Sequence, residues 1–288
     1  MSTEPSIEAR WRALEAGAAE LSPRAEGGVR VHVWLAMATA FTMWLAHGPS
    51  YAAAMLLFLL CHEGGHYLAC RVHGVSATLP FFIPAPPIFL PGTLGAVIRV
   101  RSPFPNRNAL FDMGAAGPWG GFLIALPVLA IGLRLSTVTA EPPLMDHAFH
   151  LGDSLITALM TRLVVGDVPE SVNLVYHPLA FAGWFGMLVT SLNLLPVGQL
   201  DGGHVAYAAG MRSRIFPMLL VAILVWLAWT GWVGWALWAG ILLLMIVLGH
   251  PPTMDDHHPL SPWRRMGAIA SLALLVVTFV PAPISLLP

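Results

Sequence analysis

Two histidines and a glutamate in the second apolar stretch of the chain are the residues best suited to chemistry. Within Leu56–Cys70 (LLFLLCHEGGHYLAC), the residues His62, Glu63 and His66 form an H-E-x-x-H pattern. Residues four apart on an α-helix lie on one face, about 6 Å from each other. The two imidazoles could therefore bind one zinc ion at about 2.0–2.1 Å. Glu63 would lie next to that ion as a candidate general base.

The same short pattern can also arise as a chance pentapeptide or as a polar contact between two helices. The surrounding sequence favours a functional site. Titratable side chains are costly in a bilayer core, and where they occur they usually bind ligands, conduct ions or catalyse reactions.

The composition predicts an integral membrane protein. Of the 288 residues, 57% are hydrophobic and only 10% are charged, whereas soluble domains carry about 25% charged residues. The net charge of −1 gives no reason to expect a nucleic-acid partner. Cys61 and Cys70, nine residues apart on one helix, would lie about 13 Å apart, too far for a disulfide. The first thirty residues hold no apolar run of the kind that marks a cleaved signal peptide.

We expect an all-α polytopic membrane protein with about six to seven transmembrane helices in the lipid bilayer. The apolar segments long enough to suggest spans are Val31–His47, Tyr51–Cys70, Gly114–Leu135, Leu179–Leu195, Ile215–Thr230, Trp232–Leu248 and Met266–Val280. The third opens with small residues (GAAGPWGG), which allow helices to approach closely. Residues 1–30 form a polar arm, either an interfacial amphipathic helix or a solvated one.

The connections between the spans also carry signals. Arg71–Asn108 is rich in proline and cannot be helical throughout. Within it, Gly92–Ser102 alternates and is β-branched, which predicts a small membrane-associated β-hairpin or strand between the second and third spans. Phe81–Phe89 reads as a loop dipping into the membrane boundary. Ser136–His177 reads as a polar loop with a short helix to Val165, capped by Asp153 or Ser154.

The arginines predict the orientation. An odd number of spans with a cytoplasmic N-terminus leaves only Arg134 and Arg162 outside and puts the other twelve of the fourteen basic residues inside. This distribution fits the positive-inside rule.

Two histidines do not complete a catalytic zinc site, which needs three protein ligands and an open position. Cys70 lies about 12 Å along the helix axis from His62, and His73 is farther still. Asp201 is the better candidate, because the end of the second span and the end of the fourth fall on the same side. The prolines and glycines around Asp201 would break the helix there. Asp201 as a plain cap or turn residue and His204 as a competing ligand remain alternatives.

The two motifs together resemble the site-2 protease family of intramembrane zinc metalloproteases. The resemblance covers roughly residues 50–210 and rests on His62–His66 in one span, and on Asn193-Leu194-Leu195-Pro196 and Leu200-Asp201-Gly202-Gly203-His204 in a later one. It implies Zn2+ bound by His62, His66 and Asp201, Glu63 activating the bound water, and Asn193 steadying the substrate or the oxyanion. It also implies that the hairpin edge at Gly92–Val100 could pair with an unwound substrate strand.

The resemblance divides the chain into a cytoplasmic arm (1–30), a catalytic membrane core (31–210) and C-terminal transmembrane helices (211–288). The expected substrate is a transmembrane protein cut in or near its span, and the expected location is the cell (inner) membrane. The alternatives are a divalent-metal transporter and a catalytically inactive relative. A transporter would offer polar residues along a whole pathway, whereas the ionisable groups within these spans, apart from Asp112, cluster at one depth.

Overall fold

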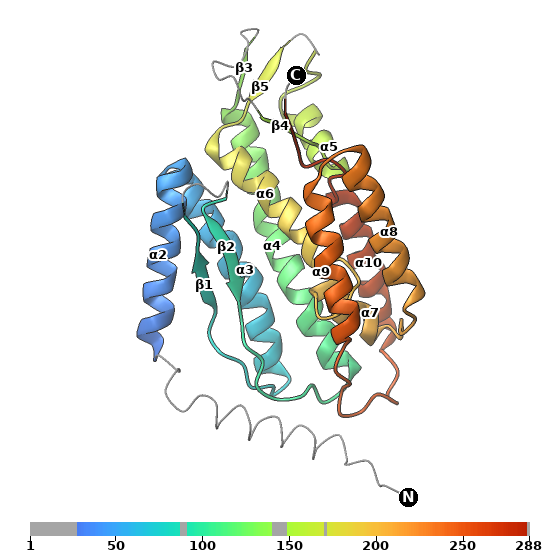
Figure 1. The fold of residues 1–288 in the computed structure, drawn as a ribbon. Helices are drawn as coiled ribbons and strands as arrows, with labels where there is room; N and C mark the ends of the chain where they lie inside the picture. The colour runs from blue at the N-terminus through green and yellow to red at the C-terminus, as the bar shows by residue number, and fades with distance from the viewer. Residues whose placement is uncertain (1–27, 87–90, 140–148, 170–171, 287–288) are drawn as a thin grey trace, which may run out of the picture.

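The computed structural model describes residues 28–86, 91–139, 149–169 and 172–286, and these residues form a mainly helical bundle (Figure 1). Most of the arm predicted at residues 1–30 lies outside this range. The first two helices, α2 (Val29–His47) and α3 (Pro49–Val72), form an antiparallel pair. Gly48 joins them with a φ of 84°, in the left-handed region that glycine tolerates. Both helices match the first two predicted spans to within two residues.

A β-hairpin runs alongside α2 and α3 (Figure 1). It pairs β1 (Phe81–Pro84) with β2 (Thr93–Val97) in antiparallel register. Gly92–Ser102 was expected to form a hairpin or a strand, and it contributes only the strand β2 to this hairpin. The other strand, β1, lies at Phe81–Pro84, where the prediction of a loop for Phe81–Phe89 is wrong. Phe82 is buried in the core, and Pro84 ends the strand because it cannot donate to the ladder.

Side chains of the first two helices hold the turn of this hairpin. The Thr42 hydroxyl donates to the Gly92 carbonyl at 2.8 Å, and the Tyr51 hydroxyl donates to the Pro91 carbonyl at 3.0 Å. A Cβ at Gly92 would lie 2.9 Å from the Met43 Cα, so only glycine permits this approach. The hairpin is therefore fixed against α2 and α3.

The long helix α4 (Arg107–Leu135) lies in the middle of the bundle and packs against α3, α6 and α7 (Figure 1). It begins about two turns before the predicted start at Gly114, because Arg107, Asn108 and Asp112 placed the expected boundary too late. The Asn106 side chain caps it by accepting from the Ala109 N–H at 3.0 Å. Small residues bring α4 close to α3, as the sequence predicts: a Cβ at Gly120 would lie 2.6 Å from the Cys61 carbonyl oxygen.

The far end of the bundle carries short strands and one short helix. The segment Ser136–His177, expected to be a polar loop with one short helix, also contributes the strands β3 (Thr137–Thr139), β4 (Phe149–Leu151) and β5 (Asn173–Val175). β3 pairs with β5, and β4 pairs with β6 (Ile284–Leu286). The predicted helix in this segment is confirmed as α5 (Leu155–Val164), with Ser154 as its N-cap.

The second half of the chain forms α6 (Pro178–Asn193), α7 (Asp201–Ala208), α8 (Ile215–Thr230), α9 (Gly234–Leu248) and α10 (Pro262–Thr278). The predicted fourth span thus ends in a break at residues 194–200, after which α7 begins. One core cluster, with Tyr51, Phe58, Leu129 and Trp184, packs α2, α3, α4 and α6 together. A second cluster packs the break against α8, α9 and α10.

Three helices of the described chain, α2, α3 and α4, are long and apolar enough to cross a membrane. The helices α6, α8, α9 and α10 have only 15 to 17 residues each. The predicted number of six to seven spans therefore stays a prediction. The start of α2 and the described C-terminus lie at opposite ends of the bundle (Figure 1), as an odd number of crossings requires.

Candidate metal centre

Three side chains from two distant parts of the chain converge at one point inside the bundle. The Nε2 atoms of His62 and His66 lie 3.2 Å apart. The two Asp201 carboxylate oxygens lie 3.3 Å from them, Oδ2 from His62 and Oδ1 from His66. Both histidines are buried and Asp201 is nearly so. These three residues make up the one group of histidine, cysteine, aspartate and glutamate side chains in the described residues that could hold a metal ion.

The two histidines come from adjacent turns of α3. The His66 Nδ1 atom lies 2.7 Å from the Met113 carbonyl oxygen of α4. A carbonyl only accepts, so Nδ1 carries the proton and the Nε2 lone pair points to the centre. Gly117 leaves room for this ring, because a Cβ at this position would overlap the His66 Nε2 atom.

The break between α6 and α7 positions Asp201. Asp201 is the first residue of α7 and follows a loop in which Gly198 has a positive φ of 57°. The two glycines after Asp201 allow α7 to pack directly on this loop. A Cβ at Gly202 would overlap the Leu194 carbonyl oxygen, and one at Gly203 would overlap the Gly198 carbonyl oxygen.

Glu63 and Asn193 lie beside the triangle. Glu63 is buried, with 6% of its surface exposed, and the Ile98 backbone N–H just after β2 donates to its carboxylate. The Asn193 Nδ2 atom, at the end of α6, lies 3.3 Å from the His62 Nε2 atom. The structure therefore brings together all five residues that the sequence singled out.

The donor atoms fit a zinc ion. A tetrahedral zinc ion with bonds of about 2.0–2.1 Å keeps its ligand atoms about 3.3 Å apart, which matches the 3.2 and 3.3 Å separations here. Two neutral imidazoles and one carboxylate form a typical catalytic donor set. The His62 Nδ1 atom is buried and has no hydrogen-bond partner among the described residues.

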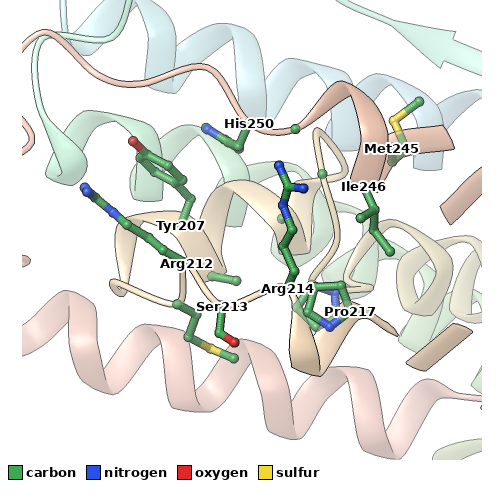
Figure 2. Close-up of a pocket in the computed structure, with 14 residues that line it drawn as sticks. Tyr207, Arg212, Ser213, Arg214, Pro217, Met245, Ile246 and His250 are labelled. Atoms are coloured by element: carbon green, nitrogen blue, oxygen red, sulfur yellow. The ribbon is translucent and has the colours of Figure 1, made fainter. Parts of the chain in front are cut away.

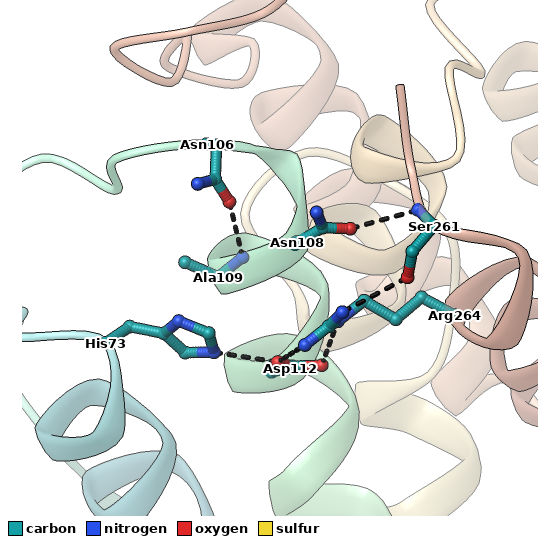
Figure 3. A network of polar contacts seen from close by, with 7 residues as sticks. All are labelled: His73, Asn106, Asn108, Ala109, Asp112, Ser261 and Arg264. Atoms are coloured by element: carbon teal, nitrogen blue, oxygen red, sulfur yellow. Dashed lines mark hydrogen bonds and ion pairs between the residues drawn. The ribbon is translucent and has the colours of Figure 1, made fainter. Parts of the chain in front are cut away.

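The remaining candidate ligands lie elsewhere. His204 faces the α9–α10 connection, where its Nδ1 atom lies 2.7 Å from the His250 Nε2 atom, in accord with packing rather than ligation. His73 lies 2.7 Å from the Asp112 carboxylate, which also pairs with Arg264 (Figure 3). Cys70 is buried in a cluster with Val75 and Leu110.

Sequence reasoning missed three features that shape the centre. The Met113 carbonyl leaves no trace in sequence, because any residue offers one. His250 lies 46 positions from His204 and carries no pattern of its own. Gly117 belongs to the small-residue run at the start of the third predicted span, so that run was a usable signal.

Comparison with known proteins places these residues in a family. The model of peptidase family M50 matches residues 50–227, which include all five candidate residues. The chain is 33% identical to the "Probable zinc metalloprotease EGY1, chloroplastic" of Oryza sativa subsp. japonica, over 80% of this chain and 40% of that protein. It is 30% identical to the protein of the same name from Arabidopsis thaliana, over 80% of this chain and 42% of that protein. The chain thus spans less than half the length of these relatives, and no solved structure matches it.

Proposed function

Since this chain belongs to peptidase family M50, the site-2 protease family, we propose that it is a zinc metalloprotease. The observation that carries the proposal is the triangle of His62, His66 and Asp201 next to the buried Glu63. The alternative of an inactive relative is disfavoured because each expected position is filled. We assign zinc binding to the three residues of the triangle and general base catalysis to Glu63.

The chemistry divides between the ion and the chain. Zinc held by His62, His66 and Asp201 would supply a bound water of lowered pKa and a Lewis acid for the scissile carbonyl. Glu63 accepts the water proton and passes it to the leaving amine. General acid–base catalysis of this kind typically raises the rate about 10²–10⁴-fold. His66 is held in the binding tautomer by the Met113 carbonyl. We assign to the Asn193 amide, which lies 3.3 Å from the His62 Nε2 atom, the role of donor to the developing oxyanion.

We further propose that the substrates are transmembrane proteins cut in or near their spans. A helix must unwind before its carbonyls can be attacked, since each is hydrogen-bonded within the helix. β2 could hold the unwound strand, because in the described hairpin β2 pairs with β1 along one edge only. The end of β2 lies beside the metal centre, because the N–H of Ile98, the residue after β2, donates to the Glu63 carboxylate.

We also propose an orientation of the chain in the membrane and the membrane in which it lies. We place the N-terminus, the α7–α8 turn and the α9–α10 connection on the cytoplasmic side, on the strength of the arginine distribution. We propose the cell (inner) membrane, with an arm at 1–30, a catalytic core at 31–210 and C-terminal transmembrane helices at 211–288. The relatives named above are chloroplastic, so an organelle membrane is the alternative outcome of fractionation.

The test is cleavage of a tagged single-span substrate by the full chain in liposomes, with zinc, with a chelator and with Glu63→Gln. We expect chelation to abolish cleavage. Glu63→Gln should reduce the rate about 10²–10⁴-fold while bound zinc persists. Cleavage by Glu63→Gln at the wild-type rate would refute the role of Glu63.

Two further variants test the ligands and the rival function. His66→Ala should lose zinc, whereas His258→Ala, which removes an exposed histidine of the α9–α10 connection, should keep it. Zinc flux into the liposomes that survives Glu63→Gln, without cleavage in the wild type, would favour the transporter instead.

A further inference from the structure

A pocket of about 280 Å³ lies beside the metal centre but is separate from it. It opens between α7, the α7–α8 turn and the end of α9 (Figure 2). None of the five site residues lines it. Its polar wall consists of Tyr207, Arg212, Ser213, Arg214 and His250, and its apolar wall includes Pro217, Met245 and Ile246. The proposed function uses none of these side chains.

The charge of the pocket is positive. No acidic residue lines it. Arg212 lies over the Tyr207 ring at 5.1 Å and pairs at 2.9 Å with Asp256, outside the lining. The Arg214 side chain makes no hydrogen bond or ion pair within the part of the chain that the structure describes. Figure 2 shows its guanidinium extending between His250 and Ile246. Arg214 thus adds a cation that no carboxylate neutralises.

The titratable groups beside the pocket leave its net charge positive near neutral pH. Burial opposes ionisation of Asp256, but hydrogen bonds from Thr253 and Tyr207 and the Arg212 charge outweigh it and lower the pKa of Asp256. Asp256 is therefore ionised and compensates Arg212. Burial lowers the pKa of His250, which stays neutral. Among the residues that line the pocket, the remaining charge is that of Arg214.

Exposed apolar side chains continue from the pocket along the first turns of α8. Ile215 is 72% exposed, Phe216 41% and Leu219 57%. A ligand that fits both surfaces carries an anionic head and an apolar tail. Arginine binds phosphate through parallel N–H donors. The α7–α8 turn and the end of α9, which line the pocket, lie at the end of the bundle where α2, α4, α8 and α10 begin (Figure 1). Arg30, Arg107 and Arg264 stand at the starts of α2, α4 and α10, so this end is rich in arginine.

We propose that this pocket binds the phosphate of an anionic phospholipid, with Arg214 and Arg212 as phosphate ligands and the start of α8 as the acyl-chain surface. The bound headgroup would link α7 to the end of α9. The same pocket is lined by Pro196, Gly198 and Gly203 from the segment that carries Asp201. Lipid binding would then steady the loop that positions Asp201, although the binding itself does not depend on protease activity.

The experiment measures lipid binding to the zinc-loaded full chain in an uncharged detergent. Short-chain phosphatidylglycerol is titrated, and the thermal unfolding midpoint reports binding, because a ligand of the folded state raises it. Phosphatidylcholine of the same chain length and inorganic phosphate are titrated in parallel. We expect a saturable rise with phosphatidylglycerol alone. An equal rise with phosphatidylcholine or with inorganic phosphate would overturn the proposal.

Two variants locate the site. Arg214→Gln removes the unneutralised guanidinium and should weaken the apparent Kd for phosphatidylglycerol about tenfold. Arg30→Gln removes an arginine at the start of α2, at the same end of the bundle and outside the pocket, and should leave the Kd unchanged. Equal Kd values for Arg214→Gln and the wild type would refute the site. Since binding is read without substrate, this result is independent of whether the chain cleaves peptides.

Discussion

The two imidazoles of the metal centre are held in different ways. His66 donates to the Met113 carbonyl and fits against Gly117, so its ring is fixed from two sides by α4. The Nδ1 atom of His62 has no such partner among the described residues. The orientation of His62 depends instead on packing near Phe58 and Gly121. The centre is therefore most sensitive to changes on the α4 face that touches α3.

Gly117→Ala tests this sensitivity. The new Cβ would overlap the His66 Nε2 atom, so the ring must move. We expect zinc affinity to fall by at least about 100-fold, because one of the three proposed ligands is displaced. Metal analysis of the purified protein after dialysis measures it.

The matched control is Gly64→Ala. Gly64 lies within the H-E-x-x-H motif itself, yet a Cβ there meets nothing within 4 Å. We expect unchanged zinc content and a gain of up to about 1 kcal/mol in helix stability. Zinc loss in both variants would mean that packing at α3–α4 does not explain the effect.

Asn193→Ala separates catalysis from metal binding. If the amide donates to the oxyanion, kcat should fall about 10²–10³-fold while zinc content stays at the wild-type level. Gln199→Ala, at an exposed position of the break that follows α6, should leave both kcat and zinc content unchanged. A loss of zinc in Asn193→Ala would instead assign Asn193 to positioning His62, which it contacts.

At the scale of elements, one ion-pair network joins three helices. Asp112 of α4 accepts from Arg264 of α10 at 2.6 and 2.7 Å, and the Nε2 atom of His73, just after α3, lies 2.7 Å from the same carboxylate (Figure 3). Arg264 also donates to the Ser261 hydroxyl just before α10. The network thus connects the helix that carries the histidines to the C-terminal helix.

Arg264→Gln should destabilise this junction. It leaves the partly buried Asp112 without its two-pronged partner, a loss of about 1–3 kcal/mol. We expect the unfolding midpoint to fall by several degrees. Arg134→Gln, at the exposed last turn of α4, is the control and should change it little. The double variant Asp112→Asn, Arg264→Gln gives the coupling between the two residues. If the two changes in the free energy of unfolding simply add, Asp112 and Arg264 do not stabilise the junction through their interaction.

The elements also show what the sequence could predict. The apolar segments located every long helix, because length and hydropathy decide where a helix can form in a bilayer. The start of α4 was predicted too late, since Arg107, Asn108 and Asp112 look like loop residues in the sequence. The partners of Asn108 and Asp112, which are Ser261 just before α10 and Arg264 within it, are about 150 positions away. The three-residue strands β3, β4 and β5 are too short to show a period of two. They exist because each pairs with a partner far away in the sequence.

The candidate site divides in the same way. The two histidines and Glu63 were identifiable from spacing alone, because one helix sets their geometry. Asp201 was inferred from topology and from the breakers around it. The hydrogen bonds of His66 to Met113 and of His204 to His250 depend on how helices pack, which no local pattern encodes.

At the scale of the whole molecule, the bundle predicts an arrangement across the membrane that accessibility can test. Ser213 in the α7–α8 turn and Asp167 after α5 should lie on opposite sides. Single cysteines are introduced as Ser213→Cys and Asp167→Cys after Cys61 and Cys70 are replaced by alanine. In sealed right-side-out vesicles, an impermeant maleimide should label position 167 and not position 213. Labelling of both positions from one side would contradict the proposed topology.

His62 and His66 belong to α3 and Asp201 belongs to α7, so the ribosome synthesises these residues at different times. Asn193, next to the break that leads to Asp201, follows His62 by 131 positions. Chains are made at about 5–20 residues per second, so the second half of the centre arrives roughly ten seconds after the first. During that interval His62 and His66 lack the Asp201 carboxylate. The proposed catalytic centre is therefore incomplete until the α6–α7 segment has been made and has packed on α4.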